Sequence, residues 1–236
     1  MLRPQILAAA LMTLVFTVLC GIAYPLVVYG IGQTAFRQKV DGSFVTQHGR
    51  VVGSKLIGQS FSDKNGNPDL RYFQPRPSAA GTGYDALSSG ASNLGPAADK
   101  LIAKCFPVPK TDSKGNPVLD AKGNAVNETN PDGTQVCDPN TVPQRVLAYR
   151  QSYGLAGDQA VPVDAVTASG SGLDPNISVA NALLQAPTVA KTRGMSVRLV
   201  AALVRDHITD RTFGVLGEKV VNVLQLNLSL DAAQGR

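Results

Sequence analysis

Residues 6–31 read ILAAALMTLVFTVLCGIAYPLVVYGI and contain no charged side chain. As a helix with a rise of roughly 1.5 Å per residue, this stretch would reach roughly 40 Å, more than the roughly 30 Å of a bilayer core. No second stretch of this kind follows it in the chain. The sequence therefore predicts a membrane anchor at 1–35, with a transmembrane helix at about 6–31, followed by one domain at 36–236.

The alternative for this stretch is a cleaved signal sequence. A secretory signal has a shorter apolar core, of roughly 7–15 residues, followed by small residues at the cleavage site. Here the run is longer, and Tyr24-Pro25-Leu26 stands where the cleavage site would lie. A bulky Leu19 before Cys20 does not fit lipoprotein processing. The sequence favours a retained anchor, with a kink or bend at Pro25 because proline lacks an N–H.

The cysteines bear on the side of the membrane. Basic residues flank the apolar stretch at both ends, so the positive-inside rule hardly distinguishes which end lies in the cytoplasm. Cys20 lies within the apolar stretch, which leaves Cys105 and Cys137 as the only pair in the domain. Such a pair predicts a disulfide, an oxidising compartment and hence an extracytoplasmic domain. Two free thiols in a cytosolic domain are the alternative.

The cysteines also bound a predicted insertion. Residues 105–142 interrupt two helical segments, at 97–104 and 144–150, and repeat the phrase Asp-x-Lys-Gly-Asn at 112–116 and 120–124. This is hairpin-turn chemistry and predicts a surface excursion, stapled at its base by the disulfide. A role of the excursion in binding a partner is the alternative.

The last third of the chain is the most regular. A helix is expected to begin at Asp174-Pro175 or at Ser178, to continue through Gln185 and to end before Pro187. Ser196 marks the start of a second amphipathic helix. Leucines at every second position from 224 to 230 alternate with polar residues, which predicts a strand. With a short strand expected at 51–61, the fold class is α+β, with helices packed on a small sheet.

Composition and motifs argue against several functions. The net charge of +5 comes from scattered basic residues, so nucleic acid is not an expected partner. His48 and His207 lack a nucleophile motif, and the chain has no phosphate loop and no metal-ligand spacing. A turn at 63–68 has calcium-loop oxygens, but Gln74 replaces the bidentate glutamate. The sequence thus predicts no catalytic residue, no metal site and no cofactor of its own.

Several phrases, taken together and in order, resemble the C subunit of the bacterial high-affinity potassium-transporting P-type ATPase. They cover nearly the whole chain outside the excursion. The phrases are YPL at 24–26, GSKLIGQSF at 53–61, YFQPRPS at 72–78, SNL at 92–94, VPVDAVTASGSGLD at 161–174, RG at 193–194 and VNVLQLNLSLD at 221–231. Two departures stand out: the excursion splits a helix that is usually continuous in the family, and Lys219 stands where a proline is common.

The resemblance implies a non-catalytic accessory subunit of an ATP-driven potassium uptake pump. Such subunits are single-pass proteins of the inner membrane with an external domain. Their implied partners are a channel-like potassium-binding subunit, an ATP-hydrolysing P-type subunit, a small single-helix subunit and membrane lipid. The implied role is assembly and stabilisation, together with a chaperone-like increase in the ATP affinity of the hydrolysing subunit. ATP, magnesium and potassium act at the level of the complex.

An external domain cannot touch cytoplasmic ATP, so an effect on ATP affinity would be allosteric. The direct-contact alternative rests on Ser88, Ser89 and Gly90, which echo the signature loop of ABC transporters, and on Gln185, which matches a family glutamine. The family-motif residues that are interface candidates are Tyr72, Phe73, Arg76, Pro77, Ser78, Asn93, Asp174, Asn222 and Asn227. Outside the pump, the alternatives are a membrane-tethered hydrolase, for which no nucleophile and base are evident, and a freestanding tethered envelope binding module.

Overall fold

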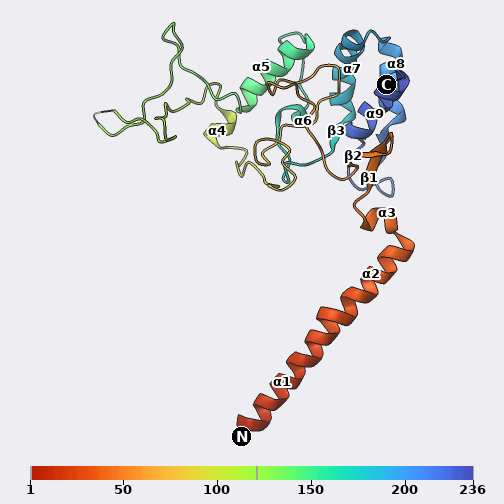
Figure 1. Ribbon diagram of the computed structural model, residues 1–236. Helices are drawn as coiled ribbons and strands as arrows, with labels where there is room; N and C mark the ends of the chain where they lie inside the picture. The colour runs from red at the N-terminus through yellow and green to blue at the C-terminus, as the bar shows by residue number, and fades with distance from the viewer. Residues whose placement is uncertain (1, 121, 236) are drawn as a thin grey trace. The chain divides into compact units, whose positions relative to one another are not determined.

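The computed structural model describes residues 2–120 and 122–235 (Figure 1). Three residues lie outside the described part of the chain: residues 1 and 236, which end the predicted anchor and domain ranges, and residue 121, which belongs to the second turn phrase. The chain divides into two compact units, Met1–Leu56 and Ile57–Arg236. The predicted boundary between residues 35 and 36 stays a prediction.

The first unit begins with the apolar helix. Helix α1 (Leu2–Val18) runs through a π-helical turn, η1 (Leu19–Ala23), into α2 (Tyr24–Ala35). The 33 residues Arg3–Ala35 are long and apolar enough to cross a membrane. Pro25 does not end the helix. The wider π turn immediately before it is a usual way to accommodate a break in helical hydrogen bonding.

A short helix and a hairpin complete the first unit. Helix α3 (Arg37–Val40) precedes strands β1 (Phe44–Gln47) and β2 (Arg50–Ser54), which pair antiparallel. His48 and Gly49 form the two-residue turn, and both have positive φ angles, of 50° and 75°. Such angles match the twist of the flanking strands. The strand expected at the start of 51–61 is confirmed.

The second unit centres on a small antiparallel sheet in the order β3-β5-β4, formed by Asn176–Ser178, Val220–Asn222 and Ile208–Thr209 respectively. Helices α7 (Val179–Arg193), α8 (Val197–Asp206) and α9 (Val223–Ala233) pack with it (Figure 1). Their buried faces form one core with strand residues Ile177 and Val221. An N-terminal apolar helix followed by helices and small antiparallel sheets agrees with the α+β expectation.

Two sequence predictions in this region are wrong. Pro187 lies inside α7, so the helix does not end there. Ser178 does cap α7, because its hydroxyl accepts a hydrogen bond from the N–H of Asn181. The predicted strand at 224–230 is the helix α9. Its buried residues, Val223, Leu224, Leu226, Asn227 and Leu230, follow helical spacing. The alternation of leucines with polar residues indicated a strand, but one of these polar residues, Asn227, lies on the buried face of a helix.

Three further helices lead to and from the excursion. They are α4 (Asp99–Ile102), α5 (Val142–Tyr153) and α6 (Val163–Val166). Thr141 caps α5, and Gly154, at φ 63°, ends it. The expected helical segments at 97–104 and 144–150 correspond to α4 and α5.

The excursion between α4 and α5 consists of irregular hairpins (Figure 1). In each repeated turn an aspartate, Asp112 or Asp120, accepts hydrogen bonds from backbone N–H groups two and four residues later. Cys105 and Cys137 form the predicted disulfide, with their Cα atoms 4.8 Å apart across a sequence separation of 32. The disulfide therefore closes the base of the excursion.

Replacing both Cys105 and Cys137 with serine should loosen the excursion. Loop-closure entropy sets the stabilisation lost at about 3–4 kcal/mol if the excursion unfolds with the rest of the domain, and at less if it opens alone. Thermal unfolding and limited proteolysis would measure this, with faster cleavage expected within 106–136. Cys20→Ser is the matched control and should have no such effect. Identical unfolding of the native chain with and without reductant would contradict the prediction.

Candidate functional site

Residues 72–78, called here the motif segment, run through the second unit as irregular chain that pairs with no strand. Phe73 is fully buried, and the rest of the segment is half-buried. Buried backbone N–H and C=O groups need hydrogen-bond partners, and here no sheet supplies them. Side chains from the surrounding helices must therefore do so.

Two buried amides fill this role. Asn227 of α9 accepts from the N–H of Phe73 at 2.8 Å and donates to its C=O at 3.0 Å. Gln185 of α7 does the same for Gln74, at 2.7 and 3.1 Å. Each amide thus copies the pair of bonds that a neighbouring strand would make. Both side chains are only 1% exposed. They hold the motif segment between α7 and α9.

The amide of Gln185 has no hydrogen-bonding position left. Besides the two bonds to Gln74, its oxygen accepts from the Tyr153 hydroxyl at 3.2 Å, and its nitrogen donates to Asn181 at 2.8 Å. An amide offers two donor and two acceptor positions, and all four are used. A ligand could bond to Gln185 only by displacing one of these partners.

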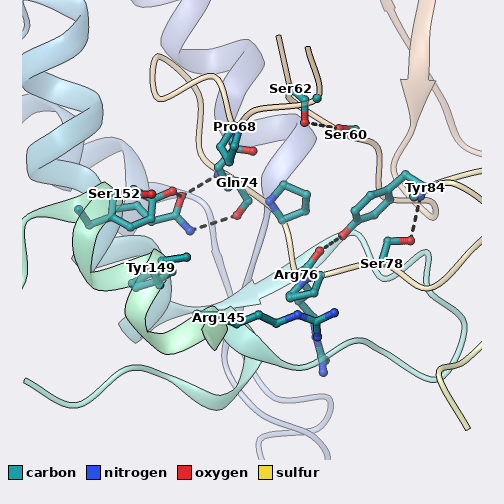
Figure 2. A pocket seen from close by; sticks show the side chains of 18 of the residues that line it. Ser60, Ser62, Pro68, Gln74, Arg76, Ser78, Tyr84, Arg145, Tyr149 and Ser152 are labelled. Atoms are coloured by element: carbon teal, nitrogen blue, oxygen red, sulfur yellow. Dashed lines mark hydrogen bonds between the residues drawn. The ribbon is translucent and has the colours of Figure 1, made fainter. Parts of the chain in front are cut away.

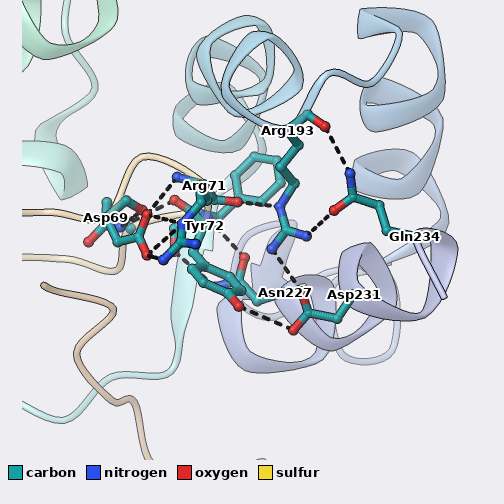
Figure 3. Close-up of polar contacts among 9 residues, drawn as sticks. Asp69, Arg71, Tyr72, Arg193, Asn227, Asp231 and Gln234 are labelled. Carbon is teal, nitrogen blue, oxygen red and sulfur yellow. Dashed lines mark hydrogen bonds and ion pairs between the residues drawn. The ribbon is translucent and has the colours of Figure 1, made fainter. Parts of the chain in front are cut away.

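Arg193, at the end of α7, holds the start of the motif segment (Figure 3). Its guanidinium is 4.5 Å from the centre of the Tyr72 ring and pairs with Asp231 of α9 at 2.9 Å. It also donates to the backbone oxygen of Arg71 and to Gln234. With 1% of its side chain exposed, this charge is buried and needs its carboxylate partner.

The far end of the motif segment is tied to residues 167–174. Arg76 pairs with Asp174 at 3.2 Å, and the Ser78 hydroxyl donates to the backbone oxygen of Gly172 at 2.6 Å. Gly172 has a φ of 69°, and a Cβ there would lie 2.7 Å from the oxygen of Gly90. Gly172 is therefore required both by its backbone angle and by the close approach of the neighbouring loop.

A cavity of about 450 Å³ lies beside the motif segment (Figure 2). Arg145 of α5 lines it, together with Arg76, Tyr84 and Tyr149. Arg145 donates to the oxygens of Val166 and Asn140, and among the described residues no carboxylate lies within ion-pair distance of it. Burial lowers its pKa and raises the pKa of the Tyr84 and Tyr149 hydroxyls. The phenols therefore stay neutral at physiological pH.

The structure brings some of the predicted site residues together and separates others. Tyr72, Phe73, Arg76, Pro77, Ser78, Asp174 and Asn227 all belong to the motif segment or contact it. Asn222 caps α9 instead, and Asn93 is exposed with a φ of 55°. Ser88, Ser89 and Gly90 do not line the cavity that Gln185 lines. Ser89 and Gly90 bond to the backbone oxygen of Ser171.

Sequence reasoning missed three polar contacts. Arg193 belongs to the RG phrase at 193–194, but nothing in that phrase signals its bonds to Asp231 and Gln234 or its contact with Tyr72. Asp164 accepts from Ser178 and Asn181 ahead of α7. His207, which caps the C-terminus of α8, lies 2.8 Å from the Ser229 hydroxyl, a pairing that no sequence motif signals. Its other ring nitrogen lies 2.8 Å from the Leu203 backbone oxygen.

The Ser229–His207 contact lies apart from the cavity. Neither residue lines it, and among the described residues no acidic side chain bonds to His207. Within the same part of the chain no group of three metal-ligating side chains exists. The site as a whole is suited to fixing a rigid conformation and presenting a surface.

Replacing Gln185 with leucine should destabilise the domain by about 2–4 kcal/mol, because it leaves the partly buried N–H and C=O of Gln74 without partners. Chemical denaturation in mild detergent would measure the loss. Gln151→Leu, at an exposed position of α5, is the matched control and should change the free energy of unfolding very little. Equal destabilisation by the two variants would show that the amide does not hold the segment.

The chain is similar to known proteins over nearly its whole length. The family model described as K+-transporting ATPase, c chain (KdpC) matches residues 6–232. A potassium-transporting ATPase KdpC subunit of Mycobacterium tuberculosis is 45% identical over 230 residues, which cover 98% of this chain and 99% of that protein. The corresponding subunit of Rhodospirillum rubrum is 41% identical, with 98% and 94% covered, and that of Koribacter versatilis is 37% identical, with 99% and 97% covered. With a family model over residues 6–232 and relatives at this identity, the chain belongs to the KdpC family.

Proposed function

We propose that this chain is a non-catalytic accessory subunit of an ATP-driven potassium uptake pump of the bacterial inner membrane. The single observation that carries the proposal is the match to KdpC subunits over nearly the full length of both chains. Its role in the pump is to assemble and stabilise the complex. ATP, magnesium and potassium are bound by the complex, whose other members are a channel-like subunit, an ATP-hydrolysing subunit and a small single-helix subunit.

The bonding of the motif segment supports a scaffold role. The polar side chains of the segment and of its partners bond to one another or to the segment's backbone. They do so through the two amides, the Arg193–Asp231 ion pair and the Arg76–Asp174 ion pair. This bonding leaves no free nucleophile and base at the segment. It produces a fixed surface on the second unit, which is what a subunit that positions others requires.

The proposed placement is a single membrane pass with the second unit outside the cytoplasm. The apolar helix supports the pass, and the disulfide supports the oxidising side of the membrane. In that placement the increase in ATP affinity is an allosteric effect, carried by the membrane helices of the complex. The fully bonded amide of Gln185 favours this version over direct nucleotide contact through residues 88–90 and Gln185.

The second candidate function is a freestanding tethered binding module, favoured by the cavity beside the motif segment. Arg145 there forms no ion pair among the described residues, although the charge of Asp138 acts on it, and together with Arg76 it lines a cavity that suits a small anion. Extracting the tagged chain in mild detergent from potassium-starved cells separates the two functions. Co-purification of the channel-like and ATP-hydrolysing subunits is expected for a pump subunit. Recovery of the chain alone, while those subunits are expressed, would favour the binding module.

Deleting the residues before Phe36 should release a soluble chain and weaken assembly, because it removes the only apolar span among the described residues. Potassium-dependent ATPase activity and co-purification would measure the loss. Replacing residues 6–31 with an unrelated transmembrane helix is the control that keeps the tether. Full activity of the deleted chain would show that the anchor is not the main docking element.

A further inference from the structure

The loop between β4 and β5 has four apolar residues in its middle, Phe213, Gly214, Val215 and Leu216, called here the apolar tip. The exposed fractions of the three side chains are 89%, 74% and 61%. Single exposed apolar residues are ordinary, but three close neighbours at the end of one loop form a patch that calls for a partner. We propose that the apolar tip inserts into the surface of the lipid bilayer that holds the N-terminal helix.

The backbone of the tip is unusual for a loop that ends in water. Phe213 has a φ of 54°, in the left-handed region that bulky residues seldom adopt. The backbone hydrogen bonds of the turn hold this angle, and Phe213 is the most exposed side chain of the tip. Strain of this kind points to a use elsewhere. The conformation turns a large apolar group outward, where a lipid surface would receive it.

Part of the same backbone is already hydrogen-bonded within the loop. The N–H groups of Gly214, Val215 and Leu216 bond to carbonyl oxygens of Arg211 and Thr212, and the N–H of Thr212 bonds to the oxygen of Leu216. Unpaired N–H and C=O groups both oppose placing a loop within the hydrocarbon core, because no water is available there to bond them, so only the side chains of the tip would enter the acyl chains. Four N–H groups of this loop are already paired before any insertion.

Charged side chains surround the base of the tip and are absent from its end. Arg211 pairs with Glu218 at 2.6 Å, and Lys219 pairs with Asp210 at 2.7 Å. All four lie between the strands and the tip in sequence. Apolar residues at the end with charged residues behind them match the change from acyl chains to headgroups at a membrane surface.

A lipid surface suits the tip better than a protein groove does. Lipid accepts apolar side chains without a matching shape, and an apolar helix retained in a bilayer would tether the chain to that surface. Tethering raises the effective concentration of that surface, so three side chains suffice where a free protein would need more. The inference rests on the helix being retained in a bilayer and does not depend on membership of the pump.

The chain contains no tryptophan, so one substitution creates a specific reporter. The full-length Phe213→Trp chain is reconstituted into phosphatidylcholine liposomes. The fluorescence of this tryptophan should have its maximum at a shorter wavelength than that of a tryptophan exposed to water. Its emission should fall when the acyl chains carry bromine, a short-range quencher. Leu87→Trp is the matched control: Leu87 is 98% exposed in a loop of the same unit, beside serines. Its emission should stay at longer wavelength and be unquenched.

Adding Leu216→Glu to Phe213→Trp should abolish the quenching while the protein still floats with the liposomes. Flotation of the liposomes with the protein reports the anchor alone. If the single variant Phe213→Trp floats but is not quenched by brominated lipid, the insertion is overturned and the anchor is intact. Loss of flotation overturns the anchor and the inference with it. A blue shift that requires the other pump subunits, without quenching by brominated lipid, assigns the tip to a protein partner and also overturns the inference.

Discussion

The second unit depends on two side-chain amides that stand in for a missing strand. Asn227 and Gln185 bond both backbone groups of consecutive residues, so an irregular segment is held in the interior without a sheet. Because the two amides come from different helices, α9 and α7, the segment joins elements that are far apart in the sequence. An apolar residue in place of either amide would leave buried backbone groups unpaired, which costs more than the burial of the side chain gains.

The same constraint explains where the family-motif residues lie. Several of the polar positions in the phrases that resemble the pump subunit bond to the motif segment or to the residues that hold it, as Arg76 does with Asp174 and Ser78 with Gly172. At these positions the phrases encode internal bonding that fixes the shape of the second unit.

The sequence predicted the apolar helix, the capped helices α7 and α8 and the disulfide, because each depends on local patterns or on a small count of residues. It failed where a polar residue is buried for a distant partner. Asn227 made α9 look like a strand, since its use becomes visible only when Phe73 is placed beside it. Pro187 failed as a helix stop because tertiary packing of α7 outweighed one lost hydrogen bond. The bonding of Gln185 could not be read from its neighbours in sequence.

The disulfide at the base of the excursion has a consequence for how the chain can vary. It fixes the two entry points with Cα atoms 4.8 Å apart, whatever the sequence does between them. To the rest of the domain, the excursion is then a closed ring attached at one place, and lengthening such a ring adds little entropy cost. Residues 106–136 are thus a natural position for an inserted epitope or label, and a region where length can drift without disturbing the core.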